Sequence, residues 1–184
     1  MAKISKAALE NETFRYVACK PNYYIAPTNK DKHGKELWNH HKMVKRTMFN
    51  YDGVEGGKTG YTTKAGGTLV TFAKRGDQEL IVVDLCAHGY ELYEDTIKML
   101  NYGFNNYKTI APFKTMNTVL KDDTYGFLKT GNELSPYKIP LKHLNDVTVM
   151  LEKKQSASKL TYKCKDNKYI ISYDGKQIGS VKLH

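Results

Sequence analysis

The sequence predicts an α/β (α+β) protein in two parts: helices with an antiparallel sheet in residues 1–112, and a small all-β, sandwich-like domain in residues 113–184. Helical periodicity appears at both ends of the first part, and strand-like runs lie between them. After Ala111 and Pro112 the pattern changes to short alternating stretches. Apolar residues three or four positions apart are typical of a helix on a core, whereas alternation is typical of a strand. A chain of 184 residues can bury one core and a small satellite.

The first part is predicted element by element. Residues 2–10 and about 12–19 form helices, and short strands at 23–26 and 35–38 flank a polar turn at 29–34. Residues 56–62, 68–74 and 80–86 form an antiparallel meander, whose second hairpin turns at 75–78. A final helix covers residues 90–104, because its apolar residues repeat at three or four positions and would cover the sheet: Tyr93, Ile97, Leu100 and Phe104.

The second part contains strand-like stretches separated by turn signals such as Asp174-Gly175. The predicted strands are residues 117–120, 147–151, 160–163, 169–173 and 177–183. Such short strands at regular spacing favour a small β-sandwich.

Composition excludes several classes of function. The net charge is +10, but the lysines are spread along the chain and no nucleic-acid motif appears, so no nucleic-acid partner is expected. A basic surface also suits anionic wall polymers or membrane surfaces. Three cysteines form no C-x-x-C pair, and Cys86 is expected to be a buried thiol on its strand. The histidines, including adjacent His40 and His41, lack a ligand pattern. No metal site is therefore expected.

No run of apolar residues is long enough to span a membrane, and the N-terminus lacks the apolar core of a signal peptide. The sequence therefore carries no visible targeting signal.

The most informative motif is Lys58-Thr59-Gly60, which follows a glycine-rich turn at 53–57 and precedes the apolar run 68–73. The Lys58 ammonium would attract a substrate carboxylate, and the Thr59 hydroxyl can donate a hydrogen bond to it. Gly60 has no Cβ, so a peptide ligand can lie close to the strand and pair with its edge.

This motif, with residues 64–67 and 72–75 around it, resembles the third active-site motif of penicillin-recognising serine enzymes. The similarity is closest to the low-molecular-weight penicillin-binding proteins, the S11-type serine D-alanyl-D-alanine carboxypeptidases. It covers residues 1–108 well and is loose beyond them. The resemblance implies that the Tyr61 backbone N–H binds the oxyanion and that Thr62 places a second hydroxyl near the substrate. It also implies an envelope location, with peptidoglycan stem peptides and β-lactams as ligands and no metal or organic cofactor.

A second copy, Lys129-Thr130-Gly131, lacks this context and is interpreted as a solvated loop. The family's nucleophile, the serine of S-x-x-K, and its S-x-N motif precede K-T-G, yet neither occurs before Lys58. The S-x-x-K strings at Ser135 and Ser156 follow it, in a segment predicted to form short strands and turns. No nucleophile is therefore assigned in this chain.

The simplest interpretation is a C-terminal fragment of such an enzyme, which alone would be inactive. The alternative is a non-catalytic wall-binding or interaction protein derived from the same fold. A basic nucleic-acid-binding module is a third, weaker reading. Near the closing helix, Leu92 stands where some relatives place a carboxylate-binding arginine. Without the family's preceding helices, the sheet is expected to expose an apolar patch that drives self-association, at Leu69, Phe72, Ile81, Val83 or their neighbours.

Overall fold

The computed structural model describes residues 1–45, 48–111, 118–120, 125–130, 133–134, 139–140, 147–166 and 168–182. The chain divides into two compact units, Met1–Asn105 and Asn106–His184. The division lies seven residues before the predicted boundary at 112, because residues 107–110 form a strand that pairs within the second unit.

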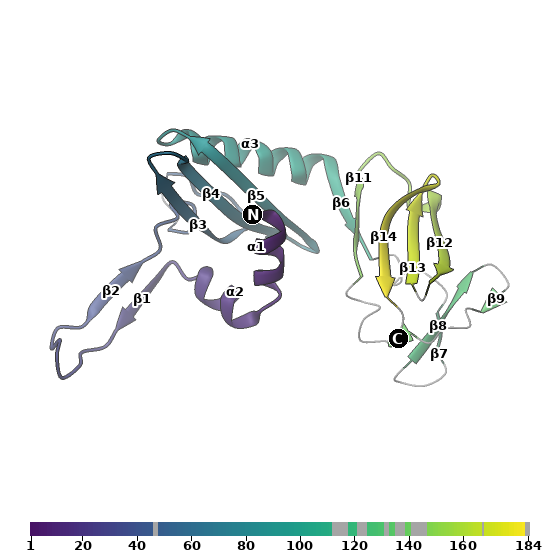
Figure 1. Ribbon diagram of the computed structural model, residues 1–184, viewed down its shortest axis with the longest axis horizontal. Helices are drawn as coiled ribbons and strands as arrows, with labels where there is room; N and C mark the ends of the chain where they lie inside the picture. Colours follow the sequence, from purple (N-terminus) through teal and green to yellow (C-terminus); the bar gives the residue numbers. More distant parts are fainter. Residues whose placement is uncertain are drawn as a thin grey trace. The chain divides into compact units, whose positions relative to one another are not determined.

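The first unit holds α1 (Ala2–Leu9), α2 (Glu12–Ala18), β1 (Asn22–Ile25), β2 (Lys35–Trp38), β3 (Val54–Thr62), β4 (Gly66–Arg75), β5 (Gln78–Ala87) and α3 (Glu91–Asn106). Strands β1 and β2 form a hairpin by themselves (Figure 1). Strands β3, β4 and β5 form an antiparallel sheet in that order, so β3 is an edge strand. The predicted helices and strands of this unit are confirmed within a few residues.

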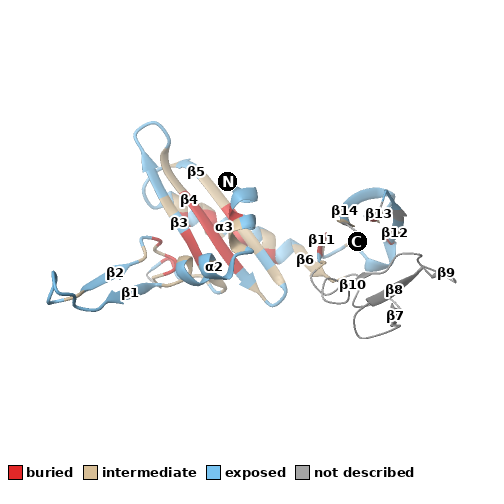
Figure 2. Ribbon diagram, turned by 60° about the horizontal axis from the view of Figure 1, so that its bottom comes forward, coloured by how far each residue is buried: buried red, intermediate tan, exposed pale blue. Residues whose placement is uncertain are grey.

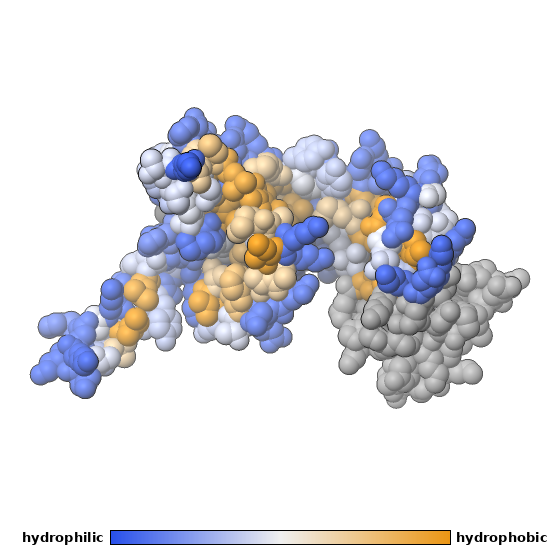
Figure 3. Space-filling model, in the orientation of Figure 1, coloured by the Kyte–Doolittle hydropathy of each residue, from blue (hydrophilic) through white to orange (hydrophobic). Residues whose placement is uncertain are grey.

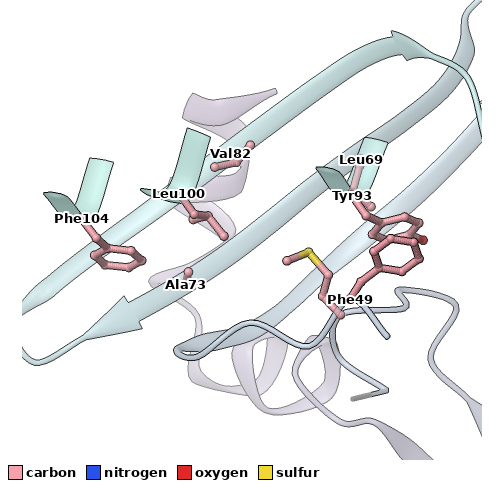
Figure 4. Packing of buried hydrophobic residues seen from close by; sticks show 8 residues of the cluster. Phe49, Leu69, Ala73, Val82, Tyr93, Leu100 and Phe104 are labelled. Carbon is pink, nitrogen blue, oxygen red and sulfur yellow. The ribbon is translucent and has the colours of Figure 1, made fainter. Parts of the chain in front are cut away.

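Helix α3 covers one face of this sheet, as its apolar periodicity predicts. Tyr93, Leu100 and Phe104 point from the helix toward Leu69, Ala73 and Val82 of the strands (Figure 4). Phe49, from the loop before β3, stacks on Tyr93 with ring centroids 4.7 Å apart. Buried residues therefore concentrate along the middle of the sheet (Figure 2).

Helix α2 covers one end of the opposite face. Phe14 contacts Phe72 of β4 with ring centroids 6.4 Å apart. Arg15 adds an ion-pair network, with its guanidinium 2.8 Å from Glu55 of β3 and 3.1 Å from Glu79 of β5. The Asn11 side chain caps the helix by accepting a hydrogen bond from the Phe14 N–H. These contacts hold α2 against the sheet.

The predicted apolar patch needs correction. Leu69 and Phe72 are only 1% and 4% exposed, because α3 covers the first and Phe14 packs on the second. Ile81 and Val83 are half-buried, whereas their neighbour Leu85 is exposed. Cys86 was expected to be buried, but it is exposed and has a φ of 63°, because it is an extra residue in β5: Thr68 pairs with Leu85 and Gly67 with Ala87, which leaves Cys86 without a partner position in β4.

The second unit consists of strands and a short 3₁₀ turn, as far as its residues are described. Its strands are β6 (Tyr107–Ile110), β7 (Thr118–Leu120), β8 (Tyr125–Thr130), β9 (Glu133–Leu134), β10 (Ile139–Pro140), β11 (Val149–Glu152), β12 (Leu160–Lys165), β13 (Lys168–Tyr173) and β14 (Lys176–Lys182). Strands β12, β13 and β14 form one antiparallel sheet, and β6 pairs with β11. Its core contains Val149, Leu151, Leu160, Tyr169 and Ile171. The predicted all-β character is confirmed.

Candidate functional site

The Lys58-Thr59-Gly60 motif lies in β3, the edge strand of the first unit's sheet. Lys58, Thr59 and Gly60 pair with Val70, Leu69 and Thr68 of β4. Among the described residues, no strand pairs with the other edge of β3. That edge can therefore accept an extended ligand as an additional strand.

Alternation along β3 divides the motif between two faces. Lys58, Gly60 and Thr62 share one face and are exposed. The Lys58 ammonium donates a hydrogen bond to the Thr59 carbonyl oxygen. Thr59 and Tyr61 lie on the α3 face, where Thr59 is half-buried and the Tyr61 side chain is 76% exposed. Helix α2 contacts this strand at Glu55, through Arg15, and at Gly56, whereas Lys58, Gly60 and Thr62 further along the same strand are exposed.

Two hydroxyl groups lie beside the exposed face. The Thr62 hydroxyl oxygen accepts a hydrogen bond of 3.0 Å from the Ala65 N–H, which closes the turn into β4. Its O–H remains able to donate to a ligand. A Cβ on Gly60 would lie 2.5 Å from the Thr68 hydroxyl oxygen, so glycine here leaves room for that hydroxyl. Thr68 was not predicted, because a threonine in an apolar strand carries no distinguishing pattern.

A glycine is required at position 57 because the α3 face of the sheet is closely packed there. A Cβ there would collide with the Val70 carbonyl oxygen and lie 2.6 Å from the His41 ring. His41 is fully buried, and its Nε2 lies 2.9 Å from the Thr71 hydroxyl oxygen. It also meets the edge of Tyr93, with ring centroids 5.9 Å apart. His41 therefore sets the position of the backbone immediately before Lys58.

His41 makes the stability of the first unit depend on pH. Burial lowers the pKa of His41 from 6.5 to about 4, although a hydrogen bond with the Val70 backbone acts in the opposite direction. The unfolded chain therefore binds a proton at a higher pH than the folded chain does. The resulting stability is present above the unfolded pKa of 6.5 and is lost as the pH falls toward 4.

We expect the free energy of unfolding of the first unit to fall by about 2 kcal/mol between pH 7 and pH 5. Urea denaturation at several pH values, followed through assigned amide signals of β4, measures it. His41→Gln should flatten this dependence, whereas His40→Gln should retain it because His40 is exposed. An unchanged dependence in His41→Gln would assign the effect to other groups.

Several other residues singled out in the sequence lie in packing or strand positions. Leu92 is half-buried and packs on the apolar cluster under α3, near Gly67, so it serves packing. Lys129 and Thr130, from the second Lys-Thr-Gly string, lie in β8 and pair with β9. The prediction that these two residues lie in a loop is therefore wrong. Gly131 and Ser135 lie outside the described residues.

Ser156 is exposed at the start of a 3₁₀ turn in the second unit. Its hydroxyl lies 2.8 Å from that of Ser158, while Lys159 lies 3.5 Å from Asp174. Among the described contacts, Ser156 and Lys159 do not form the hydrogen-bonded pair that an activated serine needs.

An apolar groove of about 460 Å³ lies between α2 and the β1–β2 hairpin. Its aromatic lining includes Tyr16, Tyr23 and Trp38, which are 65%, 57% and 51% exposed. Figure 3 shows apolar surface along this hairpin. The described residues contain no cluster of histidine, cysteine or acidic side chains that could hold a metal.

Comparison with solved structures identifies the fold. The chain superposes on penicillin-binding protein 5 from Haemophilus influenzae with a TM-score of 0.62, at 21% identity, over 98% of this chain and 53% of that protein. It also superposes on a mutant of the Streptomyces K15 DD-transpeptidase with a TM-score of 0.50, at 29% identity, over 56% of this chain and 40% of that one. The fold is therefore that of the penicillin-binding proteins.

Sequence comparison identifies a narrower family than the superpositions do. Residues 1–89 match the family described as D-alanyl-D-alanine carboxypeptidase (Peptidase_S11). The chain is 28% identical over 189 aligned residues to the D-alanyl-D-alanine carboxypeptidase DacF of Bacillus subtilis (strain 168), which covers 100% of this chain and 44% of DacF. It is 35% identical over 77 residues to DacC of Escherichia coli (strain K12), across 41% of this chain and 18% of DacC.

The resemblance predicted from the sequence is thus confirmed: residues 1–89 match the S11-type D-alanyl-D-alanine carboxypeptidase family. The chain spans less than half the length of these two curated relatives.

Proposed function

We propose that this chain is the K-T-G-bearing part of a serine D-alanyl-D-alanine carboxypeptidase that acts on peptidoglycan stem peptides. The observation that carries the proposal is the exposed face of Lys58, Gly60 and Thr62 on an unpaired strand edge, within residues that match this family. An extended peptide can pair with that edge while its terminal carboxylate meets the Lys58 ammonium.

Each residue of the motif has a role in this proposal. Lys58 supplies positive potential for the substrate carboxylate, and the Thr59 and Thr62 hydroxyls donate hydrogen bonds to it. Thr59 lies on the α3 face, so it would reach the ligand along the strand edge. Gly60 permits close approach, and the Tyr61 backbone N–H stabilises the oxyanion of the tetrahedral intermediate.

The proposed reaction has two steps. A serine hydroxyl attacks the carbonyl carbon of the penultimate D-alanine, loses its proton to a base, and forms an ester as the terminal D-alanine leaves with its amine protonated. Water then hydrolyses the ester and restores the serine. Residues 1–57 contain no S-x-x-K, so the nucleophile would come from a segment outside these 184 residues.

The chain alone is therefore expected to form no covalent adduct with a β-lactam. Intact-mass spectrometry after incubation with benzylpenicillin tests this expectation. A stoichiometric adduct on any serine would contradict it, and peptide mapping to Ser135 or Ser156 would identify a nucleophile that the present assignment leaves out. Heat-denatured chain is the control for adventitious acylation.

The proposed function implies the cell envelope of a bacterium as its place of action. None of the helices among the described residues has the length and apolar character needed to cross a membrane.

The chain could self-associate through the surface around exposed Leu85 and half-buried Val83. Light scattering at increasing protein concentration would test this.

A non-catalytic interaction protein built on this fold is the second candidate, and the groove beside the hairpin favours it. Exposed aromatic side chains around an apolar groove are typical of a surface that binds a partner. Sedimentation with insoluble peptidoglycan distinguishes the two candidates. Loss of binding in Trp38→Ser with full retention in Lys58→Ala would favour the interaction protein.

A further inference from the structure

The outer face of the β12–β14 sheet carries exposed lysines in neighbouring positions. The inner face is fixed by the core residues Leu160, Tyr169 and Ile171. Residues that alternate with them point outward. Among these, Lys163, Lys165 and Lys168 are exposed, and none of the ion pairs between described residues includes them.

Strand register places two of these lysines directly opposite each other. Lys165 pairs with Lys168 across β12 and β13, and Lys168 occupies the position opposite Lys182 of β14. Neighbouring strands are about 4.8 Å apart, and like charges directly opposite each other are unfavourable for a sheet. An anionic partner would remove this repulsion.

The remainder of the outer face is largely polar. Thr161, Ser172 and Gln177 occupy one cross-strand row, and Lys163 shares another with Ile170 and Ser180. Asp166 lies in the turn between Lys165 and Lys168 and is the acidic residue nearest to them in the chain. The face thus offers ammonium, hydroxyl and amide groups, which can bind phosphate oxygens.

We propose that this outer face binds a linear polyanion with regularly spaced phosphodiester groups. A membrane surface fits less well, because interfacial binding needs large apolar anchors beside the lysines, and Ile170 on this face is only partly exposed. Single-stranded nucleic acid fits less well too, since the described positions of this face include no aromatic side chain on which bases would stack. The inference does not depend on the activity of the Lys58 site.

Binding of the full chain to synthetic poly(glycerol phosphate), measured by calorimetry at several salt concentrations, tests the proposal. The triple variant Lys163→Gln, Lys165→Gln and Lys168→Gln should bind at least about tenfold more weakly at 50 mM salt, and its salt slope should fall by about 2 to 3. The control triple variant Lys153→Gln, Lys154→Gln and Lys159→Gln loses the same charge elsewhere in the unit, and should change affinity by less than about threefold.

Equal losses in both triple variants would overturn the proposal, because attraction would then depend on net charge alone. Tighter binding to anionic phospholipid vesicles, or to single-stranded DNA, at equal phosphate concentration would also overturn it. The melting temperature of the first triple variant should not fall, since like-charge repulsion is removed. If that variant does not fold, Lys168→Gln alone should still bind about threefold more weakly than the parent chain.

Discussion

Lys58→Ala is expected to slow acylation by a β-lactam at least about a hundredfold, the usual scale for losing a preorganised charged group. The measurement needs a nucleophile, so it uses a chimera in which the part of DacF preceding its aligned region is fused to residues 1–184. The rate of labelling by a fluorescent penicillin reports acylation. Lys58 is exposed on the open face of an edge strand, so its replacement should leave the fold intact.

Lys129→Ala in the same chimera is the matched control, because Lys129 belongs to the second Lys-Thr-Gly string and lies in a strand of the second unit. It should acylate at the parent rate. Equal losses from the two substitutions would show that the assigned triplet is wrong. If the parent chimera is not labelled, alanine substitutions in DacF itself, at the positions that align with Lys58 and Lys129, supply the comparison.

Gly57→Ala is expected to destabilise the first unit by about 2–3 kcal/mol, as overpacking of a well-packed interior does. The added methyl group would meet the Val70 carbonyl oxygen and the buried His41 ring, neither of which can move freely. Urea denaturation of the first unit measures the change. The added methyl group would also displace the backbone before Lys58, so acylation of the chimera should slow as well.

Gly60→Ala provides the contrast. Its Cβ would meet only the Thr68 side chain, whose hydroxyl can rotate away, so the loss of stability should be under about 1 kcal/mol. Acylation should nevertheless fall, because the methyl group lies on the exposed ligand face. A larger loss of stability in Gly60→Ala than in Gly57→Ala would contradict the assignment of Gly57 to packing.

The helices and strands of the first unit were predictable because each has a clear local pattern. Tyr93, Leu100 and Phe104 recur at helical spacing, and all three are buried. The three-strand meander likewise follows from apolar runs separated by turn residues. The burial of Phe72 was not predictable, because it depends on a ring contact with Phe14 nearly sixty residues earlier.

The candidate site was only partly predictable. Lys58, Gly60 and Thr62 follow from the motif, and their common face follows from strand alternation. The role of His41 could not be predicted, because no sequence pattern relates this histidine to Gly57. Only the structure shows that a Cβ on Gly57 would lie 2.6 Å from the His41 ring. The exposure of Cys86 was not predicted for a similar reason: its φ of 63° comes from the register shift between β4 and β5, which no local sequence pattern marks.

The central claim is that the free edge of β3 binds the peptide. Backbone amide NMR of the full chain, titrated with an acylated D-alanyl-D-alanine peptide, tests it most directly because binding precedes chemistry and needs no nucleophile. We expect the largest shift changes at the amides of Lys58, Thr59, Gly60, Tyr61 and Thr62, and their loss in Lys58→Ala. Saturable changes confined to β8 or to the β1–β2 hairpin, with β3 unaffected, would contradict the claim.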